Sequence, residues 1–327
     1  MQRLSVNRED PLYKYAISYM EHSWGTTGKN IFPGSQPVSV EYRHFDTLRS
    51  NPYVVCEKTD GVRFMMLAFT FDNKKRCVFI NRALEMFLCP LNFRKPIYEG
   101  TILEGELYGE TFMIYDILTE CGKVVGQFDF ISRLKCIENV KKMLTSLKYD
   151  PVKLTVKTFH LMSDYKQFKD EYLPTVSQEI DGLIFTPIND TVKTGTHETM
   201  FKWKPRDKNT IDFQIKRRGD IWKMYIQERG KLMFESEISM EQVPAYARDW
   251  MEEDAIIECQ YMFMDEPMWW KPIVRRYDKT FPNGRRTFYR TLVNIKENIS
   301  IDDFMSCISY SSNYPRVVVF FLLRVRR

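Results

Sequence analysis

The sequence is poor in the residues that bind zinc or build disulfide frameworks. Its 327 residues include only seven cysteines and four histidines, and these form no C-x-x-C pair and no zinc-ligand spacing. An odd number of scattered cysteines is typical of reduced thiols, which persist in intracellular proteins. We therefore expect an intracellular protein without a structural zinc site.

Targeting signals and several common catalytic motifs are also missing. The first ten residues contain no apolar segment of a secretory signal, and the longest apolar run, residues 317–323, is far shorter than the ~20 residues of a membrane span. The segment 25–30 resembles a P-loop, but Asn30 replaces its Ser or Thr. These features argue against a membrane partner and a P-loop enzyme. The sequence also contains no H-E-x-x-H and no serine elbow, which argues against a zinc protease and a serine hydrolase.

What is present describes an ordinary globular protein of mildly basic character. Hydrophobic residues make up 44% of the chain, charged residues 28%, and the formal net charge is +5. This charge is compatible with an anionic partner, yet far from that of a polycation. Composition therefore leaves the partner open.

The pattern of apolar residues predicts an α+β fold, because most strands are not separated by crossover helices. We expect a first domain, residues 1–208, of antiparallel sheets with helices, including a helix over 129–147 capped by Asp129 or Ser132. Short β-like runs with one helical insert at 241–251 predict an OB-fold domain over residues 209–299. A helix over 300–310 is expected to pack back on the first domain, and residues 311–327 form a tail without an assigned role.

The hexamer Lys58-Thr59-Asp60-Gly61-Val62-Arg63 suits a covalent lysine nucleophile. Lysine is almost fully protonated at neutral pH, so it attacks phosphorus only where neighbouring cations or a metal favour the free amine. Gly61 leaves room for a phosphate, and Arg63 offers a cation to hold one. The alternative is an exposed β-turn with Asp60-Gly61 at its tip. The hexamer alone does not decide between the two.

Five further motifs follow in order. They are Leu103-Glu104-Gly105-Glu106-Leu107, Met113-Ile114-Tyr115-Asp116, Ile180-Asp181-Gly182-Leu183-Ile184, Phe201-Lys202-Trp203-Lys204-Pro205 and Arg276-Tyr277-Asp278-Lys279. With the lysine hexamer they resemble the covalent nucleotidyltransferase superfamily of mRNA capping guanylyltransferases and polynucleotide ligases. Within it, Asn209-Thr210-Ile211-Asp212-Phe213 and residues 33–41 resemble the guanylyltransferase branch, closest to the compact capping enzymes of large algal DNA viruses.

The resemblance implies a role for each motif residue. It makes Lys58 the catalytic nucleophile and Asp181 a ligand of Mg²⁺ or Mn²⁺, directly or through water. Lys202 and Lys204, two residues apart, are expected on one face of a strand, where both would contact the α-phosphate. The other residues implied to bind the nucleotide are Thr59, Asp60, Arg63, Arg82, Glu106 (ribose), Tyr115 (stacking on the base), Lys157 (guanine O6), Asp212, Arg276, Asp278 and Lys279.

The implied activity is that of a GTP:RNA guanylyltransferase, which moves GMP from GTP through lysyl-GMP to the 5′-diphosphate end of RNA. An ATP-dependent polynucleotide ligase is the nearest alternative, and a catalytically inactive RNA-binding relative is another. Expected partners are GTP and RNA, with separate triphosphatase and methyltransferase chains or the transcription machinery. The expected compartment is the nucleus or the cytoplasm, of a host cell if the source is viral.

Overall fold

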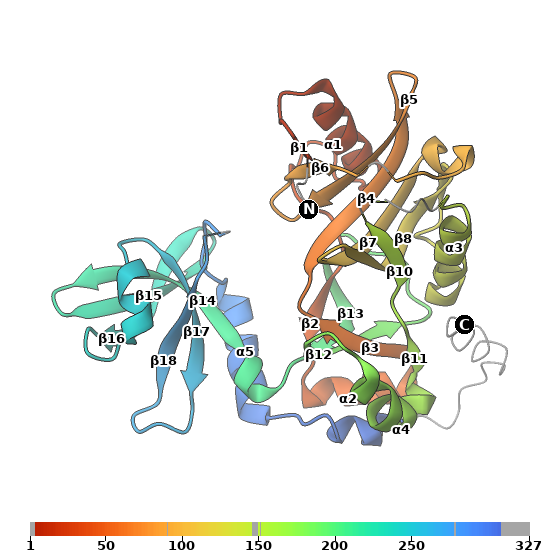
Figure 1. The fold of residues 1–327 in the computed structure, drawn as a ribbon. Helices are drawn as coiled ribbons and strands as arrows, with labels where there is room; N and C mark the ends of the chain where they lie inside the picture. The colour runs from red at the N-terminus through yellow and green to blue at the C-terminus, as the bar shows by residue number, and fades with distance from the viewer. Residues whose placement is uncertain (1–3, 90, 146–149, 151, 278, 309–327) are drawn as a thin grey trace. The chain divides into compact units, whose positions relative to one another are not determined.

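The computed structural model describes residues 4–89, 91–145, 150, 152–277 and 279–308. They pack into two compact units: the described parts of Met1–Val38, Asp46–Lys202 and Met305–Arg327 form the first, and Ser39–Phe45 with Trp203–Phe304 form the second. The predicted α+β class is confirmed, since mixed sheets and helices make up the chain (Figure 1). No helix among the described residues is long and apolar enough to cross a membrane.

The first unit contains two sheets. The larger has the order β1-β6-β5-β4-β7-β8-β10, with β9 paired to β8. Its described pairs are antiparallel except for β10, which runs parallel to β8. Its strands are β1 (Leu4–Val6), β4 (Val62–Phe71), β5 (Lys74–Asn81), β6 (Met86–Leu88), β7 (Thr101–Tyr108), β8 (Thr111–Glu120), β9 (Lys123–Val124) and β10 (Lys153–Val156).

The smaller sheet has the order β11-β3-β12-β13-β2. Its strands are β2 (Gln36–Ser39), β3 (Tyr53–Thr59), β11 (His160–Leu161), β12 (Ile180–Pro187) and β13 (Thr196–Trp203). The helices α2 (Phe45–Ser50) and α4 (Tyr165–Gln167) are short.

The larger sheet is covered on both faces, which explains the near-continuous apolar run of β4. Alternate side chains of a strand point to opposite faces. Met65, Leu67 and Phe69 pack in a cluster with α1 (Pro11–Trp24). Phe64, Met66 and Ala68 pack in a second cluster with α3 (Phe130–Lys142) and with residues of the smaller sheet (Figure 1).

Both long helices of the first unit have clear ends. Asp129 caps α3 by accepting a hydrogen bond from the Ser132 backbone at 2.9 Å, and α3 ends earlier than the predicted residue 147. We did not predict α1, although its signals are in the sequence. Asp10 accepts from the Leu12 backbone at 2.8 Å, Pro11 follows it, and Gly25 ends the helix at a φ of 64°.

The second unit holds a five-stranded antiparallel sheet of order β16-β15-β14-β17-β18. This strand content suits a small Greek-key barrel; the OB-fold assignment itself stays a prediction.

The helical insert predicted at 241–251 is a 3-10 helix, Ala245–Trp250. The segment predicted as helix 300–310 carries a 3-10 helix over Asp303–Cys307, and residues 309–310 lie outside the described part. An unpredicted helix, α5 (Arg285–Glu297), contributes Phe288 and Ile295 to the core of this unit. The strands are β14 (Thr210–Arg218), β15 (Ile221–Glu228), β16 (Lys231–Ser239), β17 (Ile256–Met262) and β18 (Trp269–Arg275).

Candidate active site

A cavity of about 340 Å³ in the first unit is lined by strands of both sheets. We call it the lysine cavity. Its size falls within the range of about 300–1,000 Å³ that is usual for small-molecule sites. Nine of the site residues predicted from sequence line it: Lys58, Thr59, Asp60, Arg63, Arg82, Glu106, Tyr115, Lys157 and Lys202.

Lys58 lies at the end of β3, where the chain leaves the smaller sheet. Asp60 and Gly61 connect β3 to β4 in the larger sheet, so they are not the tip of a hairpin, and the turn interpretation of the hexamer is wrong. Opposite Lys58, the pairing of β12 with β3 shifts between Ile180 and Gly182, a bulge that contains Asp181. Such bulges re-aim side chains. Here the Asp181 Oδ2 atom lies 2.6 Å from Lys58 Nζ, with both side chains partly buried.

A chain of polar contacts fixes the residues beside Lys58. Thr59 Oγ1 donates to Glu106 Oε2 at 2.9 Å, and the Tyr108 hydroxyl donates to the same oxygen at 3.0 Å. Lys157 Nζ donates to Thr59 Oγ1 at 2.9 Å and lies 3.2 Å from Glu57 Oε1. Burial raises the pKa of Glu57, and the adjacent Lys157 opposes this rise. The ammonium of Lys157 is therefore held in a fixed place at the wall of the cavity.

Arg63 contacts three other residues that line the lysine cavity: Ser35, Glu104 and Tyr115. Its Nη2 atom donates to the Ser35 carbonyl at 2.8 Å and to Glu104 Oε2 at 3.0 Å, and its guanidinium lies 5.9 Å from the centre of the Tyr115 ring. Burial alone would lower the pKa of Arg63, but Tyr115 and Glu104 outweigh it and raise the pKa. Burial also raises the pKa of Tyr115, so its ring is a neutral surface at physiological pH.

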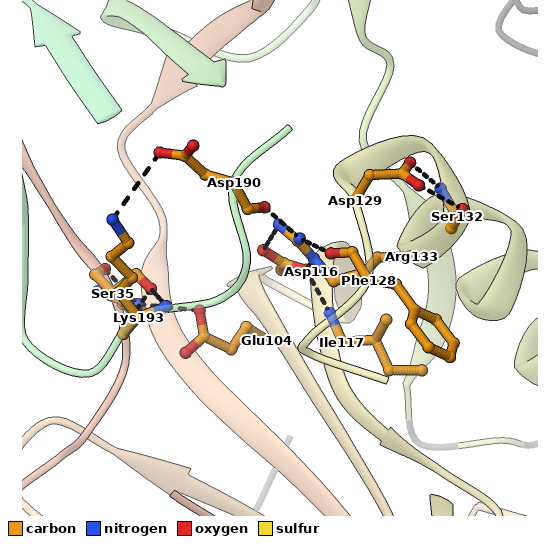
Figure 2. A network of polar contacts seen from close by, with 11 residues as sticks. Ser35, Glu104, Asp116, Ile117, Phe128, Asp129, Ser132, Arg133, Asp190 and Lys193 are labelled. Atoms are coloured by element: carbon orange, nitrogen blue, oxygen red, sulfur yellow. Dashed lines mark hydrogen bonds and ion pairs between the residues drawn. The ribbon is translucent and has the colours of Figure 1, made fainter. Parts of the chain in front are cut away.

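An ion pair between the buried Arg133 and the partly buried Asp116, which lines the lysine cavity, supports the wall. Figure 2 shows Arg133 of α3 between Asp116, Phe128 and Asp190. Its Nε atom lies 2.8 Å from Asp116 Oδ1 and its Nη2 atom 3.2 Å from Oδ2, while Nη1 donates to the backbone carbonyls of Phe128 and Asp190. A bidentate pair of this kind fixes orientation as well as position.

Three of the remaining predicted residues form a separate cluster in the second unit. Asp212, at the start of β14, is buried, and its Oδ1 atom lies 3.2 Å from Arg276 Nη1. Arg276 Nη1 is also 3.2 Å from Glu258 Oε2, and Lys279 Nζ contacts Asp212. Asp278 lies outside the described residues.

The expectation that Lys202 and Lys204 share a strand face is wrong. The strand β13 ends at Trp203, so Lys202 belongs to the strand and Lys204 lies beyond it. The Pro205 that follows cannot donate a ladder hydrogen bond, which fits the end of pairing at this point. Lys202 is in the first unit and lines the lysine cavity, whereas Lys204 belongs to the second unit.

Three acidic residues at the cavity were not predicted: Glu57, Glu104 and Asp116. Glu104 and Glu106 are two residues apart on β7, so a strand period places both on one face, and this signal was available in the sequence. Burial raises the pKa of Glu104, against the effect of Arg63. Nothing in the sequence pattern showed that Glu57 would contact Lys157, because that pair joins positions far apart in the chain.

Gly61 is required by a close approach. A Cβ atom at this position would lie 2.7 Å from Cζ of Tyr108, whose hydroxyl is held by Glu106. We expect Gly61→Ala to lower the free energy of unfolding by about 1–3 kcal/mol through overpacking, as measured by urea denaturation. The same substitution in a Tyr108→Ala background should be nearly neutral. An equal loss in both backgrounds would show that Tyr108 is not the cause.

The class to which the chain belongs follows from two family models that together match residues 7–305. A family model of the mRNA capping enzyme catalytic domain matches residues 7–206, and a model of the C-terminal domain of mRNA capping enzymes matches residues 184–305. The chain therefore belongs to the mRNA capping enzyme family.

Individual relatives agree with this assignment. The chain is 31% identical over 300 residues to an mRNA-capping enzyme of Mus musculus, an alignment that covers 82% of this chain and 47% of the mouse protein. It is 25% identical over 327 residues to the mRNA-capping enzyme subunit alpha of Schizosaccharomyces pombe, covering 85% of this chain and 80% of the yeast protein. The chain thus spans about half the length of the mouse relative.

Among solved structures, one described as mycobacterial DNA ligase D complexed with ATP and MES is similar with a TM-score of 0.41 and 15% identity. The match covers 77% of this chain and 97% of the ligase chain. A likeness of this degree does not bear on the function.

Proposed function

We propose that this protein is a GTP:RNA guanylyltransferase. It transfers GMP from GTP to Lys58 and then to the 5′-diphosphate end of RNA, which forms the GpppN cap. The observation that carries the proposal is the position of Lys58, with Asp181 at 2.6 Å, in a cavity of a capping-family catalytic domain.

In the first step, the free amine of Lys58 attacks the α-phosphorus of GTP. A P–N bond forms, the bond from the α-phosphorus to the bridging oxygen of pyrophosphate breaks, and the amine loses a proton. Before attack, Lys58 has to leave the ion pair with Asp181. Asp181 is then the carboxylate closest to the proton that departs, and the approaching phosphates replace it as the counter-charge of the cations in the cavity.

The fixed residues around Lys58 suit the parts of GTP. Glu106 is an acceptor for ribose hydroxyls, and the neutral ring of Tyr115 offers a face for the base, where stacking is worth about 1–3 kcal/mol. Lys157, held by Thr59 and Glu57, is the donor we assign to guanine O6. Arg63, Arg82 and Lys202 add positive charge for the phosphates.

A divalent cation fits this donor set. Mg²⁺ is usually held by one or two carboxylates together with substrate phosphates, and no described group of three or more His, Cys, Asp and Glu side chains could hold a metal by itself. We propose Asp181 as its protein ligand, directly or through water. When bound, Mg²⁺ or Mn²⁺ would neutralise charge that develops on the phosphates.

In the second step, a terminal phosphate oxygen of the RNA diphosphate attacks the phosphorus of lysyl-GMP, the P–N bond breaks, and the Lys58 amine regains a proton. We propose that Lys204 contacts the α-phosphate of GTP in the first step and that Asp212 supports the site. Arg276, Asp278 and Lys279 are proposed to act in the same step on the β- and γ-phosphates. Triphosphatase and methyltransferase activities are assigned to other domains or chains, in keeping with the subunit name of the Schizosaccharomyces pombe relative. The expected site of action is intracellular.

Covalent labelling tests the proposal. Incubation with [α-³²P]GTP and Mg²⁺ should label the protein, incubation with [α-³²P]ATP should label it far less, and RNA with a 5′-diphosphate should remove the label as capped product. Preferential labelling by ATP would instead identify a ligase-type enzyme. No labelling by either nucleotide would identify a catalytically inactive relative.

A further inference from the structure

A chain of five polar side chains connects two parts of the lysine cavity wall. Glu57 Oε1 lies 3.2 Å from Lys157 Nζ, which donates to Thr59 Oγ1 at 2.9 Å. Thr59 Oγ1 donates in turn to Glu106 Oε2 at 2.9 Å, and the Tyr108 hydroxyl donates to the same oxygen at 3.0 Å. We call these five residues the polar chain. Its first four members line the cavity, and Tyr108 contacts Glu106 from outside the lining.

Near one end of the polar chain, Lys157 keeps one hydrogen-bond donor for a ligand. An ammonium group has three N–H donors and no acceptor. Glu57 and Thr59 occupy two of the three, and no other described residue pairs with the amine of Lys157. The third donor is thus open to a ligand in the cavity. Guanine O6 is an acceptor that matches it, whereas adenine carries an amino donor at the same ring position.

Near the other end, Glu106 keeps one acceptor oxygen. Thr59 and Tyr108 both donate to Oε2, and no described residue donates to Oε1. Burial raises the pKa of the Tyr108 hydroxyl, which therefore keeps its proton and remains a donor at neutral pH. The open oxygen of Glu106 matches a ribose hydroxyl. A deoxyribose that lacks this hydroxyl would leave a partly buried carboxylate oxygen without its donor.

The residues that hold these two groups decide how sharply the groups discriminate. A site rejects the wrong ligand strongly only where its own polar groups stay fixed and would be left unpaired. Lysine has a long flexible side chain, so the amine of Lys157 keeps its place because the buried carboxylate of Glu57 opposes it, at side-chain exposures of 6% and 3%. A buried pair of this kind is weak evidence for stability by itself. Its position at the cavity wall points to a role in recognition.

We propose that Glu57 and Tyr108 are positioning residues that set the nucleoside selectivity of the enzyme. Glu57 fixes Lys157 for guanine over adenine, and Tyr108 fixes Glu106 for ribose over deoxyribose. This inference rests on the proposed guanylyltransferase function. Because the two residues hold opposite ends of the polar chain, each end can be disturbed separately, and each variant serves as the matched control of the other.

At the base end, Glu57→Gln replaces the carboxylate by an amide of the same shape. In the full chain, the preference for GTP over ATP should fall about tenfold, as expected for one charge-assisted hydrogen bond, while the preference for GTP over its deoxy analogues stays at the wild-type value. The measurement is the rate of lysyl-nucleotide formation from each α-³²P-labelled nucleotide at subsaturating concentration with Mg²⁺. Glu57→Asp, which keeps the charge but draws it back by one methylene, is the second variant if the amide impairs folding.

At the sugar end, Tyr108→Phe removes only the hydroxyl and keeps the ring that lies against Gly61. The relevant preference is for GTP over 2′- or 3′-deoxy-GTP, whichever labels the wild type more slowly. It should fall about three- to tenfold, because Glu106 loses one of the two donors that orient it. The preference for GTP over ATP should stay at the wild-type value. A partly unfolded preparation lowers labelling by every nucleotide together, so it cancels from these ratios.

Three results would overturn the inference. Labelling that falls by the same factor with all nucleotides would reduce the substituted residue to a structural role. Loss of base selection in Tyr108→Phe, or of sugar selection in Glu57→Gln, would break the assignment of the two ends. Equal wild-type labelling by GTP and both deoxy analogues would show that Glu106 does not select the ribose. In each case a wild type that prefers GTP to ATP leaves the proposed function intact, and only a wild type that prefers ATP rejects it.

Discussion

Replacing Lys58 by alanine is expected to abolish covalent labelling by GTP, a loss of roughly 10⁴-fold or more, because no other atom can take the place of the attacking amine. Lys58→Arg should be equally inactive. Its guanidinium keeps the positive charge and can still reach Asp181, but it does not deprotonate and cannot form the phosphoramidate. The measurement is the yield of ³²P-labelled protein from [α-³²P]GTP and Mg²⁺ after denaturing gel electrophoresis.

The loss of labelling in Lys58→Ala and Lys58→Arg should not result from unfolding of these variants. The Lys58–Asp181 pair is partly exposed, with side-chain exposures of 23% and 15%, and such pairs are worth at most about 1 kcal/mol after solvent screening. The urea midpoint of both variants should therefore stay close to that of the unmodified protein. Lys157 and Lys202 also line the cavity, so labelling that persists in Lys58→Ala would transfer the nucleophile assignment to one of them.

The sequence predicted which residues form the site better than it predicted how those residues contact one another. Of the nine predicted residues that line one cavity, seven belong to the ordered motifs, and Arg82 and Lys157 come from the wider resemblance; together they are distributed from Lys58 to Lys202. The hexamer could not show that Asp60 and Gly61 pass between two sheets, because strand partners depend on contacts remote in sequence. The same limit hid the contact of Lys157 with Glu57 and the bulge that aims Asp181 at Lys58.

The two long helices missing from the prediction, α1 and α5, differ in the signals that mark their ends in the sequence. The helix α1 has strong caps in the sequence, Asp10 at its start and Gly25 at its end, although it lies outside every motif. The helix α5 begins at Arg285, and its N-cap residue Gly284 has no side chain to accept a hydrogen bond, so its start carries no comparable signal. The face of α5 that holds Phe288 and Ile295 is stabilised by the core of the second unit, and tertiary packing of this kind outweighs local propensity.

The second large effect is expected at Arg133. Its side chain is 3% exposed, and Arg133→Met would leave Asp116, 16% exposed, without its bidentate partner and would remove the donor to the carbonyls of Phe128 and Asp190 (Figure 2). Because Arg133 is buried while Asp116 is only partly buried, losing the pair and the two hydrogen bonds to backbone carbonyls is expected to destabilise by about 1–3 kcal/mol. Urea denaturation followed by circular dichroism measures the loss.

Two comparisons isolate the cause. Lys166→Ala removes an exposed pair with Asp170, at side-chain exposures of 72% and 41%, and should change the free energy of unfolding by less than about 1 kcal/mol. The double variant Arg133→Met/Asp116→Leu removes both charges of the pair and should be more stable than Arg133→Met alone, because no carboxylate is left uncompensated. If the double variant is no more stable than the single one, the loss comes from packing and the backbone carbonyls, and the ion pair is not what holds this wall of the lysine cavity.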